Sequence, residues 1–433
     1  MTALPLWFKH LDKEIDELKR FLRVKVPNES VCPKCRGVKL LCGRKTCPVI
    51  LQFYSILDFK KFSDINEISG NSPPSIFVGR YGYPRVEIGP MVPPIKGDTA
   101  IYDFPEKWTN LSLMDILRFR SALIHGRLKA DVRKPWKLGR NYDLILDLAL
   151  SRNSPEVEMR FSKKPTKTLV ITEEIIPFGP TAPVKSMKLG SFKIDHELDK
   201  CFADLDLKAS DAVVELYKGG VPISSIQRAF SVGALGVKGS RRIVPTRWSI
   251  TAVDSIISKW LIDKIKEYPS INEFHVYEHR NFDNLFIALL IPGKWSYEWL
   301  EAWFPGTFWN KFGIRAVIYS DYERFKGRKC YAENTGGCYY AARLAVAEKL
   351  YSLKRQAIAI LFREVYEGYL FPIGVWNVRE NYRRAFKGRP KKFESLKKAL
   401  NHVMKKLRIP LSRWAEKSTL LHELFYQRKI TEF

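Results

Sequence analysis

The chain has 433 residues, of which 45% are hydrophobic and 27% are charged, a composition typical of globular domains and not of disordered or fibrous proteins. Lys and Arg number 73 against 46 Asp and Glu, so the formal net charge is +27. This excess excludes mimics of acidic substrates and indicates a polyanionic partner, with nucleic acid first and an acidic membrane surface second.

Residues 285–291 and 357–362 are the longest apolar runs, and both are too short to cross a bilayer. The first eight residues lack the pattern of a signal peptide, and seven Cys, an odd number, argue against a disulfide framework. We therefore expect a cytoplasmic protein associated with the nucleoid. Only four Gln occur in a chain rich in Lys, Arg and Glu, which resembles thermophilic proteins.

The predicted helices and strands along the chain indicate an α+β fold with three regions. Residues 1–65 are expected to form an N-terminal helix and a small module that contains four Cys. Residues 66–270 are expected to form a mixed α/β central domain with an Arg-rich loop. Residues 271–433 are expected to form a C-terminal α+β and helical domain that is basic and ends in a short terminal peptide. Positions 377–433 alone carry a net charge of +11.

Hydrophobic periodicity and turn residues predict the elements in chain order. Residues 10–24 have apolar side chains three and four positions apart, which predicts an amphipathic helix. Gly and Pro are dense in residues 69–107, which predicts irregular backbone and short strands. Further helices are expected at 111–124, 142–150, 209–217, 223–230, 249–266, 341–353, 356–367 and 393–406. Strands are expected at 168–176, 274–278, 285–291 and 314–320.

Four Cys near the N-terminus form the pattern C-x2-C-x6-C-x4-C: Cys32, Cys35, Cys42 and Cys47. Two such pairs can surround one tetrahedral Zn²⁺, and a zinc ribbon is the favoured interpretation over a [4Fe–4S] cluster. Without a nearby His to suggest an open catalytic position, we expect the zinc to be structural. The other Cys are expected to be buried free thiols, with a disulfide between the last two as the alternative: Cys201, Cys330 and Cys338.

The last seven residues contain Gln427, Ile430 and Phe433 at spacings of three. One helical turn would place Ile430 and Phe433 side by side as an apolar plug, with the Gln427 amide beside them. This spacing is that of a PCNA-interacting peptide, although the second aromatic residue of the full pattern is absent. A frayed terminal segment is the alternative.

Residues 233–254 combine a Gly-rich backbone with basic residues and hydroxyls that lead into a helix. Backbone N–H groups, a helix N-terminus and fixed guanidinium groups suit phosphate binding, although the Walker A ending is missing. The alternative is that the Arg side chains pair with carboxylates between domains. The residues expected to contact nucleic acid or phosphate are Lys238, Arg241, Arg242, Arg247 and Trp248.

Three further patterns admit a functional and a structural interpretation. Residues 211–230 resemble a DNA-reading helix–turn–helix, but two packed helices are more often purely structural. Residues 339–343 and 376–384 mix Tyr, Trp and Arg; they either stack bases or form core with a buried Arg–Glu pair. A His close to an acidic residue is expected by chance in a chain of this length, as for His125 near Asp131 and for the pair Glu278-His279. No catalytic residue is therefore assigned.

Together these features resemble the archaeal Nre family of DNA repair proteins. The resemblance rests on the Cys module, the terminal peptide and four strings: residues 76–84, 89–91, 241–254 and 374–381. It implies a role in repairing DNA damage, coupled to the sliding clamp, but it supplies no reaction. The leading interpretation is a DNA-binding factor recruited to PCNA. The alternatives are a nuclease or glycosylase that acts on damaged DNA, and an RNA-binding factor.

Overall fold

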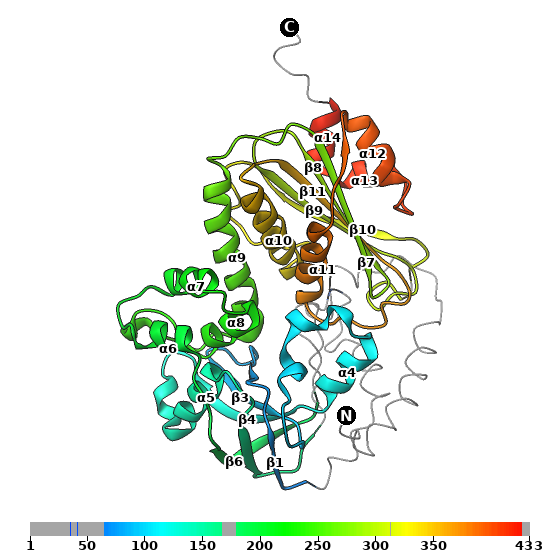
Figure 1. Ribbon diagram of the computed structural model, residues 1–433. Coiled ribbons are helices and arrows are strands. Elements are labelled where there is room, and N and C mark those ends of the chain that lie inside the picture. Colours follow the sequence, from blue (N-terminus) through cyan, green and yellow to red (C-terminus); the bar gives the residue numbers. More distant parts are fainter. Residues whose placement is uncertain (1–34, 36–40, 42–64, 167–178, 312, 427–433) are drawn as a thin grey trace. The chain divides into compact units, whose positions relative to one another are not determined.

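Figure 1 shows a computed structural model of the protein, which describes Cys35, Leu41 and residues 65–166, 179–311 and 313–426. The described chain forms two compact units. Of the described residues, those from 65 to 257 belong to the first unit, and Cys35, Leu41 and those from 258 onward belong to the second.

The first unit is built on a six-stranded mixed sheet with the strand order β1-β5-β6-β4-β3-β2. Strands β4 and β6 pair in parallel, while the other neighbours are antiparallel. Along β5, Val157, Met159 and Phe161 are buried and the residues between them are not, so one face packs on the core. The strands are β1 Glu67–Asn71, β2 Ile76–Val78, β3 Arg85–Val92, β4 Ile124–Asp131, β5 Glu156–Phe161 and β6 Thr181–Leu189.

Helices of the first unit begin where the sequence supplies capping groups. Ser112 and Asp115 form a capping box at the start of α4, and Asp195 caps α6 through its side chain. The α-helices are α4 Leu113–Ser121, α5 Arg140–Leu150, α6 His196–Ala203, α7 Ala209–Lys218, α8 Ile223–Ser231 and α9 Thr246–Ile265, which continues into the second unit. The 3₁₀ helices are η3 Ala100–Asp103, η4 Pro105–Asn110, η5 Pro135–Leu138 and η6 Lys238–Ser240.

The second unit contains a six-stranded mixed sheet with the order β10-β9-β11-β8-β7-β12, in which β9 and β11 are the parallel pair. The β7–β8 hairpin turns through Phe282 and Asp283, both with positive φ, as a two-residue primed turn requires. The strands are β7 Phe274–Asn281, β8 Asn284–Ile291, β9 Ser296–Trp303, β10 Val317–Glu323, β11 Ile358–Val365 and β12 Lys391–Phe393.

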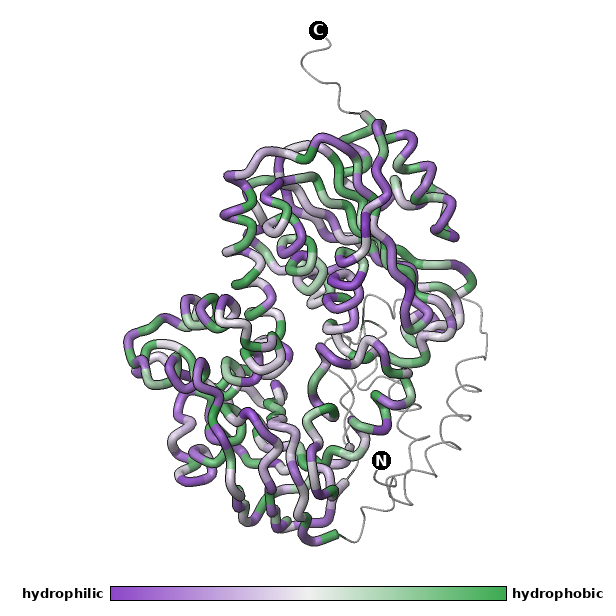
Figure 2. The backbone as a smooth tube through the Cα atoms, viewed as in Figure 1, coloured by the Kyte–Doolittle hydropathy of each residue, from purple (hydrophilic) through white to green (hydrophobic). Residues whose placement is uncertain are grey.

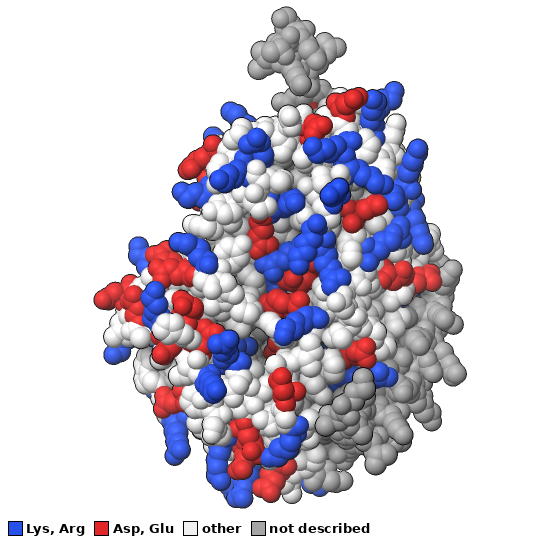
Figure 3. Space-filling model, viewed as in Figure 1, with Lys and Arg blue, Asp and Glu red and all other residues white. Residues whose placement is uncertain are grey.

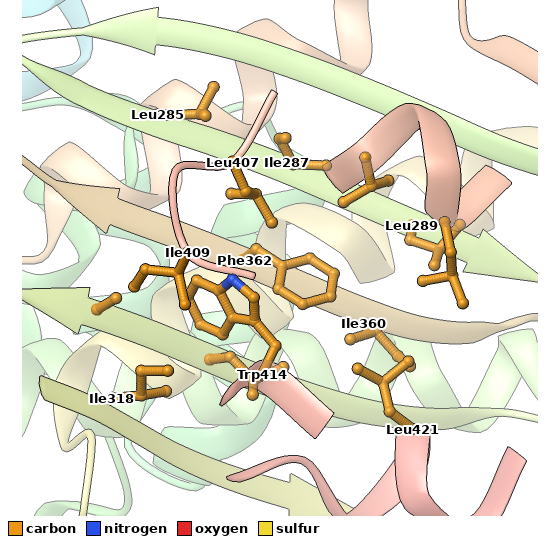
Figure 4. Packing of buried hydrophobic residues seen from close by; sticks show 14 of the residues in the cluster. Leu285, Ile287, Leu289, Ile318, Ile360, Phe362, Leu407, Ile409, Trp414 and Leu421 are labelled. Atoms are coloured by element: carbon orange, nitrogen blue, oxygen red, sulfur yellow. The ribbon is translucent and has the colours of Figure 1, made fainter. Parts of the chain in front are cut away.

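Helices cover both faces of this second sheet. On one face, the ring of Tyr382 in α11 packs against Phe286 and Trp299. On the other, Ile287 and Phe362 belong to one hydrophobic core with Trp414, together with residues of α12 and α14 (Figure 4). In Figure 2 hydrophobic stretches of this sheet lie beside hydrophilic ones, since β8 is apolar over most of its length and β7 is largely polar. The helices are α10 Gly337–Leu353, α11 Trp376–Lys387, α12 Leu396–Met404, α13 Leu411–Lys417 and α14 Thr419–Tyr426.

The predicted α+β class is confirmed, and six predicted helices are found within a few residues of their expected bounds, as α5, α7, α8, α9, α10 and α12. The helix predicted at 111–124 ends at Ser121, because β4 begins at Ile124. Strands β7 and β8 lie where they were expected, whereas β9 was not predicted and β10 begins three residues late. The strand predicted at 168–176 and the helix predicted at 10–24 lie outside the described residues.

The helix predicted at 356–367 is wrong, because residues 358–365 form strand β11. This strand lies between β9 and β8, and every residue from Ala359 to Val365 is buried. A strand buried on both faces has no alternation of polar and apolar residues, so its sequence cannot be told from a buried helix by periodicity. The second unit combines this sheet with helices α10–α14, so the predicted mixture of strands and helices in the C-terminal region is confirmed.

Candidate nucleic-acid interface

The loop that follows β2 lies against the first turn of α9. The backbone N–H of Val78 donates a hydrogen bond to Oγ1 of Thr246 (2.9 Å). The ring of Tyr83 lies against that of Trp248, with their centroids 5.1 Å apart. These contacts bring together two parts of the chain that are 168 positions apart.

The turn that follows β4 joins the same surface. The N–H of Val132 donates to the carbonyl of Pro84 (3.0 Å), and the N–H of Ile243 donates to the carbonyl of Val132 (3.1 Å). Backbone hydrogen bonds therefore tie three segments of the first unit together. We call them the basic–aromatic surface: residues 79–85, 131–140 and 237–248.

Large aromatic side chains are exposed on this surface. Tyr81 is 72% exposed, Trp136 63%, Tyr83 46% and Trp248 43%. Within the described part of the first unit, these four account for all exposed Phe, Tyr and Trp side chains. Rings of this size are usually buried, so their concentration on three adjoining segments is typical of a binding surface.

A glycine fixes the tight turn that presents two of these rings. Gly82 has φ +78°, and a Cβ added there would lie 2.8 Å from the carbonyl oxygen of Arg85. The N–H of Arg85 donates back to the carbonyl of Gly82 (2.9 Å). Tyr81 and Tyr83 flank this glycine, and the guanidinium of Arg80 lies 5.1 Å from the centroid of the Tyr81 ring. The turn therefore presents the Arg80 guanidinium and the Tyr81 ring side by side.

Positive charge is concentrated on the same segments. They contain one acidic residue, Asp131, and ten basic ones: Arg80, Arg85, Arg133, Lys134, Lys137, Arg140, Lys238, Arg241, Arg242 and Arg247. Figure 3 shows one face of the molecule, on which basic and acidic side chains are interspersed. A cluster of one sign beside exposed rings is what a nucleic-acid surface requires, because cations bind phosphates and rings stack on bases.

The five predicted phosphate-binding residues occupy different environments. Lys238, Arg242 and Trp248 are exposed, and Arg247 is half-buried. Arg241 instead joins its loop to the C-terminal end of α6, because its guanidinium donates to three backbone carbonyls at 2.7–2.9 Å, those of residues 236, 202 and 204. Burial lowers the pKa of this guanidinium, although nearby tyrosine and aspartate side chains oppose the shift. Of the five predicted residues, Arg241 thus has its guanidinium engaged by backbone carbonyls of its own unit.

Sequence reasoning missed more than half of this surface. The rings of Tyr81, Tyr83 and Trp136 and the cations Arg133 and Lys134 were not singled out as site residues. The signal was present in two short runs, residues 80–85 and 133–137, where cations and aromatic residues alternate with Gly or Pro. Such runs predict exposed turns, and an aromatic residue in an exposed turn indicates binding.

The DNA-reading interpretation of the helix–turn–helix is wrong, although α7 and α8 are both present. Gln227 is buried and donates to Oδ1 of Asp254 (3.1 Å). Ser224 donates to a glutamate of η4, and Nε of Arg228 donates to the carbonyl of Ala149 (2.8 Å). The side chains suited to base edges are therefore engaged within the unit.

The base-stacking interpretation of the two Tyr- and Arg-rich segments in the second unit is also wrong. Tyr339, Arg343 and Tyr382 are buried, as is most of α11. Nη1 of Arg343 lies 2.8 Å from Oε2 of Glu323, which also accepts a hydrogen bond from the Tyr339 hydroxyl. The alternative, core packing with a buried Arg–Glu pair, is confirmed.

The titratable side chains that the sequence left open do not form a reactive arrangement in the described residues. Burial lowers the pKa of His125 to about 3, with a nearby arginine adding to the shift, so its imidazole is neutral at pH 7. Glu278 forms an ion pair with Lys406 (3.0 Å).

A cavity of about 600 Å³ in the first unit is lined by several charged side chains. Two of its carboxylates are already engaged, because Asp103 pairs with an arginine and Asp195 caps α6. No catalytic residue is assigned.

Of the four predicted zinc ligands, Cys35 is buried, whereas Cys32, Cys42 and Cys47 lie outside the described residues. The clamp-binding residues Gln427, Ile430 and Phe433 lie outside them as well. Among the residues described, no cluster of three or more His, Cys, Asp or Glu side chains is arranged to hold a metal.

The three remaining cysteines are not joined by a disulfide to any residue that the structure describes. Cys201 and Cys338 are buried as predicted, whereas Cys330 is exposed, so the expectation of burial is wrong for that residue. In the part of the chain that the structure covers, every helix is too short or too polar to span a membrane.

Comparison with known proteins gives consistent matches along the chain. A family model described as archaeal Nre, N-terminal, matches residues 41–310, and one described as archaeal Nre, C-terminal, matches residues 323–433. DNA repair protein NreB of Archaeoglobus fulgidus is 43% identical over 403 residues, which is 93% of this chain and 99% of the relative.

Two further relatives carry similar names. DNA repair protein NreA of Archaeoglobus fulgidus is 33% identical, over 87% of this chain and 93% of its own length. DNA repair protein NreA of Haloferax volcanii is 32% identical, over 85% of this chain and 91% of its own. No solved structure matches.

Proposed function

Because this chain belongs to the archaeal Nre family, whose curated relatives are named DNA repair proteins, we propose that it is a repair factor that binds DNA and is recruited to the PCNA sliding clamp. One observation carries the DNA-binding part: nine cations besides the internally bonded Arg241, and four exposed rings, lie on three adjoining segments, with Asp131 as the one acidic residue there. The spacing of Gln427, Ile430 and Phe433 supports the clamp-binding part.

The charge of the basic–aromatic surface is tested by removing three exposed cations, Arg133, Lys134 and Arg242. We expect the triple Ala variant to bind DNA about 10- to 100-fold more weakly at about 100 mM salt. Because each lost phosphate contact keeps about one counterion on the DNA, the slope of log K against log salt concentration should become shallower by about 2–3. Fluorescence anisotropy with labelled oligonucleotides over a salt series measures both quantities.

A matched control removes the same charge elsewhere on the first unit, at the exposed residues Lys185, Lys193 and Lys200. This variant should bind DNA almost as tightly as the unmodified protein. Equal weakening by both triple variants would mean that the net charge, and not this surface, governs binding. Failure of the unmodified protein to bind DNA at low salt would refute the proposal.

We also propose that Cys32, Cys35, Cys42 and Cys47 hold one structural Zn²⁺. Four thiolates form a closed donor set, and the burial of Cys35 suits a ligand of such a site. When bound, the metal would stabilise the N-terminal region by linking two Cys pairs.

Metal analysis of the purified protein should find one zinc per chain. Cys35→Ser should lower that content and destabilise the N-terminal region toward proteolysis, because three thiolates bind Zn²⁺ more weakly than four. Cys201→Ser, which also replaces a buried thiol, should keep the zinc. Iron with the visible absorption of a cluster, or a metal-free protein of full stability, would contradict this proposal.

A further inference from the structure

The exposed rings of the basic–aromatic surface need a partner that offers flat apolar faces. In a duplex, base faces are covered by their neighbours and only base edges and the backbone are accessible. An aromatic side chain can stack on a base only where that base is unpaired or displaced. A surface that binds only the phosphates of a duplex therefore does not need exposed aromatic rings, and this surface has four.

We propose that this surface binds single-stranded DNA, with Tyr81 and Trp248 stacking on unpaired bases while the surrounding cations hold the phosphates. The inference rests on the proposed DNA-binding function and deepens it by naming the form of DNA. RNA offers the same stacking chemistry, and we commit to DNA because the relatives are named DNA repair proteins.

Trp248 is positioned to act as a platform. It lies in the first turn of α9, and the ring of Tyr83 supports it at 5.1 Å with an angle of 56° between the ring planes. Despite this contact, 43% of Trp248 stays exposed. A ring held by a neighbour loses little conformational freedom when a base stacks on it, so more of the stacking energy contributes to affinity.

Tyr81 lies on the Gly82 turn, two positions before the ring that supports Trp248. It is 72% exposed, and Arg80 lies over its ring, which adds a planar cation to the stacking surface. Arg242 is exposed within the segment that precedes Trp248. Cations thus lie close in sequence to both rings. Phosphates and bases alternate along a single strand of DNA, so a surface that binds such a strand needs cations beside its stacking rings.

The test compares binding of oligo-dT of about 20 nucleotides with that of a duplex of the same length, a span that covers one or more sites of typical size. The unmodified protein should bind the single strand more tightly. Trp248→Ala and Tyr81→Ala should each weaken single-strand binding about 5- to 100-fold and leave duplex binding and the salt slope nearly unchanged. Trp248→Phe should restore most of the loss. Tyr351→Ala, which removes a 37% exposed ring of the second unit, is the matched control.

The outcomes separate this inference from the function on which it rests. Equal or tighter binding of the duplex, or single-strand binding that neither ring variant weakens, would overturn the inference and leave the DNA-binding function intact. Tighter binding of oligo-rU than of oligo-dT would overturn the choice of DNA. Absence of binding to every oligonucleotide would overturn the proposed function itself. Because Tyr81 is mostly exposed, its variant keeps the test valid even if Trp248→Ala unfolds.

Discussion

Replacing Glu301 with Leu is expected to lower the free energy of unfolding of the second unit by about 3–5 kcal/mol. Glu301 and Arg363 are fully buried in adjacent strands, β9 and β11, and form an ion pair of 2.8 Å. Nε of Arg363 also donates to Asn284 (2.8 Å). Removing the carboxylate leaves a buried guanidinium without its main counter-charge, and desolvation of that charge is the cost.

Urea denaturation followed by tryptophan fluorescence measures this change, because seven of the eleven Trp lie in the second unit. The double variant Glu301→Leu/Arg363→Met should be more stable than the single variant by about 2 kcal/mol or more, since it removes the uncompensated charge. Glu394→Ala breaks an exposed pair with Lys398 and should leave the transition nearly unchanged. A loss below about 1 kcal/mol for Glu301→Leu would show that the pair adds little to this fold.

Deleting residues 427–433 is expected to abolish binding to PCNA, a loss of at least about 100-fold, while the thermal unfolding of the rest is unchanged. The double variant Ile430→Ala/Phe433→Ala should reproduce the loss, because these side chains form the proposed apolar plug and anchors of this kind dominate peptide affinity. Isothermal titration calorimetry with purified clamp measures the affinity.

Thr431→Ala is the control within the same segment and should keep most of the affinity. Clamp binding that survives the deletion would mean that another part of the chain makes the contact. If the terminal peptide does bind, a clamp already loaded on DNA should hold this protein far more tightly than the clamp alone or DNA alone. Binding at one of the two contacts raises the effective concentration for binding at the other.

Local sequence signals predicted the helices best. Residues 142–150, 209–217 and 223–230 form amphipathic segments with clear apolar periodicity, and all three are helical. Strand β11 was misassigned because its burial between two other strands depends on pairing partners more than 50 residues away, which no local window contains.

Sequence alone established the α+β class, the strong positive charge, the Cys pattern, the terminal peptide and the family resemblance. These depend on composition and spacing, which the chain carries without folding. Only the tertiary structure showed which polar side chains are engaged inside the fold, such as Gln227 and Arg343, and which are left for a partner. It also brought Tyr81, Trp136 and Trp248 to one surface, because hydrogen bonds between distant strands and loops, and not sequence neighbourhood, decide which residues meet.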